Sequence, residues 1–143
     1  MADITSANST LLIGISGLFT VPQQLQGFSA DDAYEMAAVD NKEISLGVDG
    51  VLSAGWIPAV KVLSVTLQAD SASNTFFETW FASEEAARTP YFGFGVITQP
   101  SINRIYTLTN GVLKNYTPLA QAAKTLRPRK FEIHFQTVLG APT

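Results

Sequence analysis

The chain of 143 residues contains no cysteine and a single histidine, His134. Without cysteine there can be no disulfides and no thiolate chemistry. Histidine-based metal sites and nucleophile–histidine catalytic sites need further groups that are missing here. His134 alternates with apolar residues in a predicted strand, and we therefore assign it to the polar face of that strand.

Charged residues are also scarce, at 15% of the chain, against about a quarter in typical soluble domains. Mean hydropathy is slightly positive. Much of the surface must therefore be neutral polar or apolar, as expected for a protein covered by partner subunits. The alternative is a monomer with a neutral polar surface.

The sequence lacks a long hydrophobic run. The longest, around residues 11–19, is interrupted by Gly14, Ser16 and Gly17 and is too short to span a bilayer. The first residues also lack the basic region of a secretion signal. We therefore expect a soluble cytoplasmic product without a membrane anchor.

The few charges are unevenly distributed along the chain. Residues 1–87 hold eleven of the twelve acidic residues and two of the nine basic ones, for a net charge of −9. Residues 88–143 hold seven bases and only Glu132, for a net charge of +6. If the fold keeps these halves apart, copies can meet acidic face to basic face, in rings or filaments. If the fold interleaves them, the charges compensate within one chain.

A strand pattern followed directly by a helix pattern occupies residues 60–88. Leu63, Val65 and Leu67 alternate with polar residues over residues 60–69, which predicts a strand with one buried face. Short polar side chains at residues 70–74 then favour a helix start, and Thr75 with Glu78 fits a capping box. An aromatic stripe follows, and the helix is expected to end at Arg88 before Thr89-Pro90. The stripe consists of Phe76, Phe77, Trp80 and Phe81, and we assign it to core packing.

The rest of the chain reads as strands and turns. Hairpins are predicted around Asp40-Asn41 and around Asn110-Gly111, the second being the strongest hairpin signal in the sequence. Asp49-Gly50 is a further turn signal, followed by an apolar loop. The predicted strands cover residues 11–21, 33–39, 42–48, 60–69, 91–98, 102–109, 112–117 and 130–139.

These elements predict one mainly β domain over residues 1–143. We expect an antiparallel β-sandwich or barrel of about eight strands with one flanking α-helix. A flexible N-terminal arm, about residues 1–9, and a short C-terminal tail, about residues 140–143, are expected outside it.

No residue pattern supports catalysis, and neither a cofactor nor a metal site is expected. Asp31-Asp32 and Glu84-Glu85 are sequence neighbours, which do not face each other on a strand or helix. The basic cluster at residues 127–130 lacks stacking aromatics, and a pI near 5.0 argues against a nucleic-acid footprint. We interpret the cluster as a strand entry that pairs with acids of the same or another subunit. The chain is therefore predicted not to be an enzyme.

The order of features over residues 33–80 resembles the tail tube proteins of contractile-tailed bacteriophages. The similarity lies in Gly47-Val48-Asp49-Gly50, a long loop, the strand at residues 60–67 and the segment Gln68-Ala69-Asp70-Ser71-Ala72-Ser73-Asn74, which matches a "Q-x-x-S-x-S-N" helix entry. The resemblance covers about two-thirds of the chain. The loop containing Trp56 is more apolar than the family pattern.

The resemblance implies a structural virion protein of the phage tail. Six copies would form a ring with a continuous inner β-barrel, and rings would stack into a hollow tube assembled in the bacterial cytoplasm. Phage DNA would pass through the lumen without specific binding during ejection. A contractile sheath and the baseplate would be the other partners.

The same resemblance suggests interface roles for particular residues. Candidates to line the lumen, where acidic groups would repel DNA phosphates, are Glu35, Asp40 and Glu43. The loop at residues 49–59 is the candidate for contact between rings, with Asp49, Gly50, Trp56, Ile57 and Pro58. Arg127, Arg129 and Lys130 are candidate partners for acids on a neighbouring subunit or the sheath.

Other interpretations fit the same residues. A related secretion-system or tailocin tube, or a baseplate protein that initiates the tube, would have the same sequence features. Trp56 could instead pack on its own core. A different class of function is a monomeric β-barrel that binds a small ligand or sugar beside Trp56 and Tyr91.

Overall fold

The computed structural model describes residues 9–28 and 34–142. Most of the predicted N-terminal arm and the Asp31-Asp32 pair lie outside these residues. The strands are β1 Thr10–Ile15, β2 Phe19–Gln24, β3 Tyr34–Met36, β4 Lys42–Leu46, β5 Leu52–Trp56, β6 Lys61–Leu67, β7 Gly93–Gln99, β8 Arg104–Tyr116 and β9 Arg129–Pro142. The helix α1 spans Asn74–Ala87, and a short 3-10 turn spans Pro100–Ile102.

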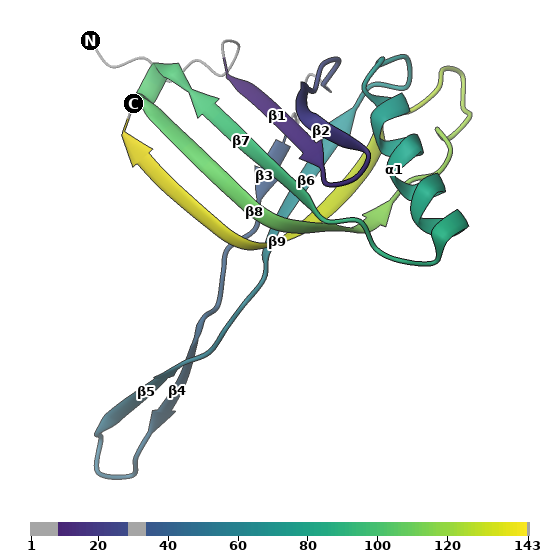
Figure 1. Ribbon diagram of the computed structural model, residues 1–143. Helices are drawn as coiled ribbons and strands as arrows, with labels where there is room; N and C mark the ends of the chain where they lie inside the picture. The colour runs from purple at the N-terminus through teal and green to yellow at the C-terminus, as the bar shows by residue number, and fades with distance from the viewer. Residues whose placement is uncertain (1–8, 29–33, 143) are drawn as a thin grey trace.

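The strands form two antiparallel sheets of very different character (Figure 1). Seven strands form a curled sheet in the order β2-β1-β7-β8-β9-β6-β3, so that β2 and β3 are its edges. The other two, β4 and β5, form a hairpin that extends away from the body. The predicted mainly β fold with one flanking helix is confirmed.

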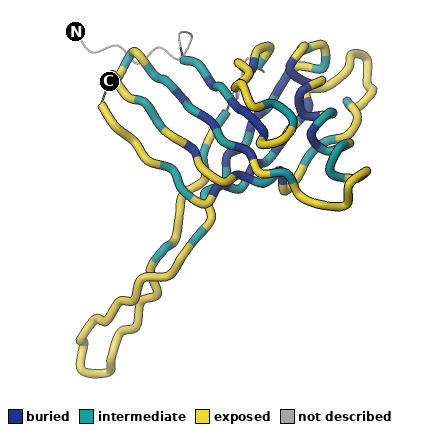
Figure 2. The backbone as a smooth tube through the Cα atoms, viewed as in Figure 1, coloured by how far each residue is buried: buried dark blue, intermediate teal, exposed yellow. Residues whose placement is uncertain are grey.

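The core lies inside the curl of the large sheet, where α1 covers one end (Figure 1). The predicted alternation is confirmed in β6, where Leu63, Val65 and Leu67 are buried. It is also confirmed in β9, where Phe131, Ile133 and Phe135 are fully buried. Figure 2 shows that the buried positions are confined to this body, while the β4–β5 hairpin is exposed along its length.

The aromatic stripe of α1 packs on the sheet, as predicted. The rings of Phe77 and Phe131 stack with centroids 4.2 Å apart. Trp80 is fully buried, and its Nε1 donates a hydrogen bond to the Tyr91 carbonyl at 3.2 Å. The helix is thereby fixed to β9 and to the chain leading into β7.

The predicted capping box is wrong. The N-cap of α1 is Ser73, which makes no side-chain capping bond, and the Glu78 carboxylate pairs with Arg129 instead. The Thr75 carbonyl accepts a hydrogen bond from the Thr79 hydroxyl. The predicted C-terminus is correct to within a residue, because Arg88 is the C-cap in the left-handed conformation.

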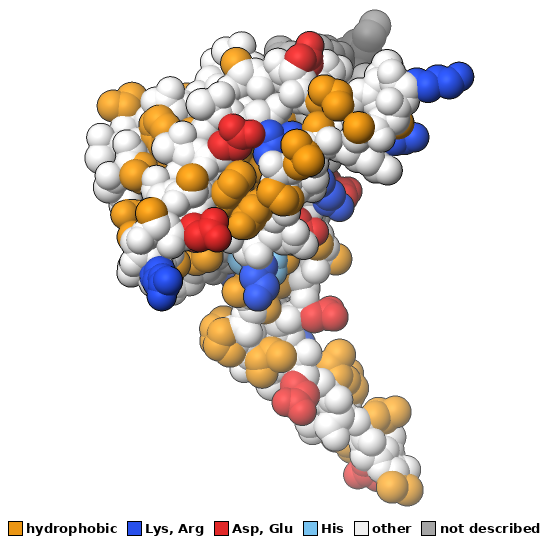
Figure 3. Space-filling view, turned by 90° about the vertical axis from the view of Figure 1, so that its right-hand side faces the viewer, with side chains coloured by type: hydrophobic (Ala, Val, Ile, Leu, Met, Phe, Trp, Pro, Cys, Tyr) orange, Lys and Arg blue, Asp and Glu red, His pale blue; other side chains and the backbone are white. Residues whose placement is uncertain are grey.

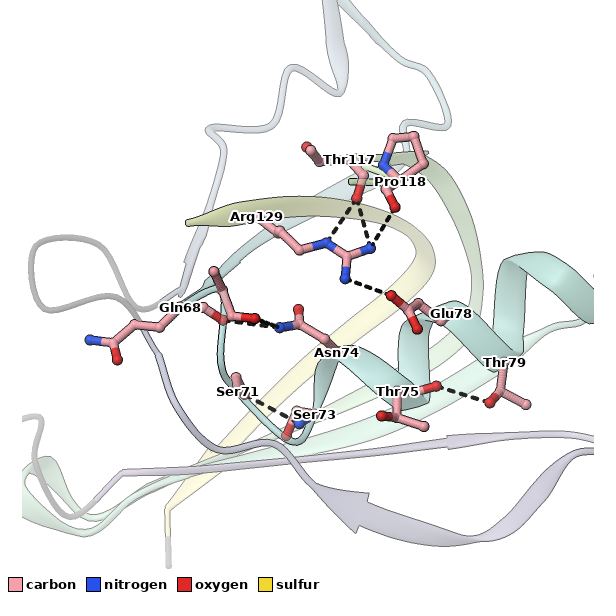
Figure 4. Close-up of polar contacts among 11 residues, drawn as sticks. Gln68, Ser71, Ser73, Asn74, Thr75, Glu78, Thr79, Thr117, Pro118 and Arg129 are labelled. Atoms are coloured by element: carbon pink, nitrogen blue, oxygen red, sulfur yellow. Dashed lines mark hydrogen bonds and ion pairs between the residues drawn. The ribbon is translucent and has the colours of Figure 1, made fainter. Parts of the chain in front are cut away.

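The serine and asparagine side chains at the start of α1 hold the helix entry in place, and Figure 4 shows Asn74 bonded back to the end of β6. Asn74 Nδ2 donates to the carbonyls of Gln68 at 3.0 Å and Ala69 at 3.2 Å. The hydroxyl of Ser73 accepts from the backbone N–H of Gln26 at 2.8 Å, and Ser71 Oγ donates to the Gln26 carbonyl. The Ser-x-Ser-Asn motif therefore has a structural role.

The Asn110-Gly111 hairpin prediction is wrong, because these residues lie within the single long strand β8. Asn110 has a positive φ of 51°. Before it, the even-numbered position Leu108 faces the core, and after it the odd-numbered position Gly111 does. In β9 the inward-facing positions change from Phe135 to the partly buried Val138. The two strands bend together at this point (Figure 1), so the turn signal produces a bend rather than a reversal.

Other predicted boundaries also need correction. Residues 11–21 form two strands, β1 and β2, joined by a turn at residues 16–18. Asp40-Asn41 is no hairpin turn, because β3 pairs with β6 while β4 pairs with β5 across Asp49-Gly50. The expected C-terminal tail is a strand as far as Pro142, which pairs with Arg104.

The bend generates a first prediction, because a Cβ at Gly111 would overlap the Phe135 ring. Gly111→Ala is expected to lower the free energy of unfolding by about 1–3 kcal/mol through this overpacking, measured by denaturant unfolding. Gly55→Ala is the control, because a Cβ there meets nothing within 4 Å. Equal stability of the two variants would contradict the packing role of Gly111.

Candidate functional site

The β4–β5 hairpin, residues 42–56, is the most unusual surface of the molecule, and we call it the arm. Its turn is closed by two backbone hydrogen bonds, from the Gly47 N–H to the Val51 carbonyl and from the Gly50 N–H to the Gly47 carbonyl, both 2.9 Å. The Asp49 carboxylate adds a third, in which Oδ1 accepts from the Val51 N–H at 3.1 Å. Gly50 has a φ of 85°, a conformation that glycine adopts without strain. The predicted Asp-Gly turn is therefore present, at the end of the arm.

The arm has one apolar and one polar face, and neither packs on the body. The register Lys42↔Trp56, Ile44↔Ala54 and Leu46↔Leu52 puts the apolar side chains on one face, while Glu43, Ser45 and Ser53 occupy the other. Ile44, Leu46, Leu52 and Trp56 are each 63–68% exposed. A lone two-stranded hairpin is marginally stable in water, and clustered exposed apolar residues mark an interaction site.

A hollow of about 770 Å³ lies where the arm joins the body, and we call it the root hollow. Its walls include Trp56, Pro58 and Val60 from the arm side and Phe92, Val112 and His134 from the body. Figure 3 shows the histidine at the neck between body and arm, beside a basic side chain and hydrophobic ones. Lys61 also lines the hollow, and its Nζ donates to the Ala59 carbonyl at 3.1 Å and the Gln136 carbonyl at 3.2 Å.

The residues predicted to touch other rings fall on the arm and its root. Asp49 and Gly50 lie at the tip, and Trp56 is on the apolar face. Ile57 and Pro58 follow directly and are exposed. Trp56 is itself 68% exposed, so it does not pack on its own core. Tyr91, proposed as its neighbour in a ligand site, instead packs against the core. Phe92 takes that place in the root hollow.

The three acidic lumen candidates are all exposed but do not form one cluster. Glu35 lies on the outer face of β3, paired with Ser64 of β6. Asp40 precedes the arm, and Glu43 is on the arm's polar face. Their position in a lumen stays a prediction.

Of the two alternatives for the basic cluster, Arg129 takes the first, because it pairs with an acid of its own chain, and its predicted contact with a neighbouring subunit is corrected. Arg127 and Lys130 are exposed, and their partners stay a prediction. Arg129 is only 5% exposed and its guanidinium is used within the chain (Figure 4). It donates to the Thr117 carbonyl at 3.1 and 3.0 Å, to the Pro118 carbonyl at 3.1 Å and to Glu78 Oε1 at 2.8 Å. It thus fixes the loop after β8 to α1.

One titratable group on α1 is perturbed by its surroundings. Burial raises the pKa of the Glu84 carboxyl, and weaker hydrogen bonding from the Tyr91 backbone and the Trp80 indole opposes this only in part. Its Oε1 is buried without a hydrogen-bond partner. Charge at this position therefore opposes folding.

Within residues 9–28 and 34–142, no cluster of three or more His, Cys, Asp or Glu residues could hold a metal ion. The helix in this same part of the chain is not long and apolar enough to cross a membrane.

Comparisons with known proteins give a family and a fold. A family model described as "Tail fiber protein gp32" matches residues 2–139. No curated protein matches the chain. Among solved structures, a chain of the anti-feeding prophage tube-terminating cap has a TM-score of 0.67 at 8% identity, covering 100% of this chain and 93% of that one.

Two further structures give the same result. A chain from the PVC sheath/tube terminator, part of an extracellular contractile injection system, has a TM-score of 0.67 at 8% identity, covering 99% of this chain and 98% of the other. A chain of the anti-feeding prophage baseplate has a TM-score of 0.63 at 12% identity, covering 99% and 97%. The fold expected from the resemblance is therefore shared with chains of a tube-terminating cap, a sheath/tube terminator and a baseplate.

The Arg129 contacts generate a second prediction. Arg129→Lys retains the charge but cannot reproduce the planar fork that reaches two carbonyls and a carboxylate. We expect a loss of about 2 kcal/mol in the free energy of unfolding, measured by denaturant titration. Arg127→Lys, two residues earlier and exposed, is the control and should unfold like the parent. A harmless Arg129→Lys would show that the fork is dispensable.

Glu84 generates a third prediction, on pH. Because the pKa of Glu84 is higher in the folded state than its ordinary value of 4.5, its stabilising contribution is present at low pH and lost as pH rises through the folded value. Glu84→Gln should therefore raise the melting temperature at pH 7 and not below pH 4.5. The exposed neighbour variant Glu85→Gln is the control. A gain from Glu84→Gln that did not depend on pH would contradict this assignment.

Proposed function

The chain belongs to the family described as Tail fiber protein gp32, and from this we propose that it is a structural, non-enzymatic subunit of a phage or phage-like tail particle. In this proposal the chains self-assemble into hexameric rings that stack as a hollow tail tube, inside the sheath and joined to the baseplate. The family description supports a tail protein, and chains of similar fold come from a tube-terminating cap, a tube terminator and a baseplate. The arm favours a tube over a fibre.

The exposed apolar face of the arm is the observation that carries this proposal. Ile44, Leu46, Leu52 and Trp56 are largely exposed in the single chain. Burying such side chains contributes about 1.5–3 kcal/mol each, which is ample to drive association. A protein that kept this face in water would be poorly soluble, so we infer that another copy covers it.

The two edges of the large sheet support ring formation. In the described part of the chain, β2 and β3 lie at opposite edges with no further strand beside them, and an unpaired edge is a template for another strand. Pairing β2 of one copy with β3 of the next would be heterologous, and such contacts close into rings when the rotation fits. Both strands are short, with six and three residues.

The three acidic candidates are proposed to line the lumen and to keep DNA from binding there. Glu35, Asp40 and Glu43 are exposed and therefore free to face a lumen. Carboxylates there would repel the phosphate backbone and allow DNA to slide without specific binding. This orientation requires the arm's polar face to line the hole while its apolar face meets a neighbouring subunit.

A second candidate function is a tube terminator or baseplate ring. The solved structures that match at full length include a cap, a terminator and a baseplate chain. Such a subunit would use the same ring contacts but would be bound by a second ring on one side only. Isolated rings that do not stack would favour this candidate.

Self-assembly is the fourth prediction and can be tested by electron microscopy with light scattering. The parent protein should form rings or tubes. A variant with Ile44, Leu46 and Leu52 replaced by Thr should remain a folded 15.4 kDa monomer, because Thr keeps the strand preference but removes the apolar face. The control replaces Leu119 and Leu126 by Thr, two exposed residues in the segment between β8 and β9, which lies away from the arm (Figure 1).

Tryptophan fluorescence provides a second readout of the same test. Trp80 is already fully buried, whereas Trp56 is 68% exposed, so a blue shift on assembly must come from Trp56. The shift should be lost in Trp56→Phe. The proposal fails if the parent stays monomeric at high concentration, or if the triple Thr variant assembles like the parent.

A further inference from the structure

The arm joins the body through two linkers that lack strand structure, residues 37–41 and 57–60 (Figure 1). At the body end, the Ala37 N–H donates to the Val62 carbonyl at 3.1 Å. At the arm end, the Ile57 N–H donates to the Asn41 carbonyl at 2.9 Å. Between these two points, no backbone hydrogen bond among the described residues joins one linker to the other. Changes in a few loop dihedrals reorient an attached element, so the two linkers together have the character of a hinge.

The side chain of Lys61 crosses this hinge. Its Nζ donates to the carbonyl of Ala59, inside the second linker, at 3.1 Å and to the carbonyl of Gln136, on β9, at 3.2 Å. Hydrogen bonds with a charged donor are stronger than neutral ones. Gln136 is also tied to β8, because its Oε1 accepts from Asn110 Nδ2 at 2.8 Å. A continuous chain of hydrogen bonds therefore runs from the linker to the shared bend of β8 and β9.

We propose that Lys61 is a positioning residue for the arm: its ammonium latches the second linker to the bend and thereby sets the direction in which the arm leaves the body. Lys61 begins β6 and is paired with Phe135 of β9, so its own backbone is held by the large sheet. The root hollow, of about 770 Å³, lies beside the latch. Packed side chains do not fill that space, so the polar contacts of Lys61 take over the role of fixing the linker.

The latch has a consequence for association, and this step rests on the proposed function. There the apolar face of the arm is the surface that a second copy covers. An arm that swings on its linkers must be ordered when that copy binds, and ordering costs conformational entropy. A latched arm has lost this freedom before the copies meet. Lys61 therefore lowers the free-energy cost of the first contact between two chains.

Distances between two spin labels, measured by pulsed electron paramagnetic resonance, test the latch directly because the chain has no cysteine of its own. Val48→Cys places one label at the tip of the arm and Leu139→Cys places the other on β9, and both positions are exposed. The full-length chain also carries Ile44→Thr, Leu46→Thr and Leu52→Thr, so that no second copy holds the arm. Labelled chains are diluted with unlabelled ones, so the distance lies within one molecule. With Lys61 in place, we expect one narrow distance distribution.

Three substitutions separate the latch from a general effect of charge. Lys61→Met removes the donors but keeps an unbranched stem, so the fraction of chains with the arm away from its latched direction should rise about fivefold or more. Lys61→Arg keeps N–H donors at the end of a flexible stem and should retain the narrow distribution. Lys130→Met is the matched control and should also retain it. Lys130 is exposed and is paired with Thr66 near the other end of the same two strands.

The outcomes separate the latch from the function to which it contributes. A distribution that broadens in Lys61→Met alone supports the latch, whereas an unchanged one overturns it whether or not the protein forms rings. A second label pair, Val21→Cys with Leu139→Cys, lies wholly on the large sheet and reports whether the body keeps its fold. If Lys61→Met disturbs that pair, the chain with Lys61 decides alone, because a broad distribution there contradicts a latched arm.

Light scattering of unlabelled chains that keep the apolar face tests the consequence for association. Lys61→Met should delay the start of assembly by about fivefold or more, and Lys130→Met is again the control. If the arm is released and assembly starts at the parent rate, the latch does not serve association and that step is wrong. If the parent never associates, the proposed function is wrong, while the label distances still decide whether Lys61 holds the arm.

Discussion

The fold depends on the shared bend of β8 and β9. At Asn110 and Gln136, which are joined by a side-chain hydrogen bond of 2.8 Å, the inward-facing positions of both strands change parity. Without this change, Val138 and Leu108 would face solvent while Phe135 faced the core. The bend curls a seven-stranded sheet around one core, so β1 and β7 contribute to the same cluster as β6 and β9. The bend also forms one wall of the root hollow, since Asn110 and Gln136 line it.

The sequence predicted the elements whose signal is internal to one segment. Alternation located the buried faces of β6 and β9, and the aromatic spacing located the buried face of α1, because both signals report which side meets the core. Turn signals were less informative. Asn-Gly favours a left-handed residue, and Asn110 adopts one, but whether the chain then reverses or bends depends on the partner strand. That partner, β9, begins eighteen residues after Gly111.

Arg129 shows a different limit of sequence interpretation. Its position two residues before Phe131 gives it the parity of the buried face, so alternation alone would have placed it inside. Its charge suggested the surface instead. Burial is possible because Glu78 and the carbonyls of Thr117 and Pro118 satisfy the guanidinium. These partners come from α1 and the loop after β8, and their meeting is set by the tertiary fold.

The low charge of the chain and the exposed apolar face of the arm both favour the proposed assembly. This face is too large to leave in water and too far from the core to be buried there, so the fold of one chain is incomplete with respect to hydrophobic burial. This chain is only 8–12% identical to the chains of a cap, a terminator and a baseplate that have a similar structure. It therefore shares its fold with them rather than particular contacts.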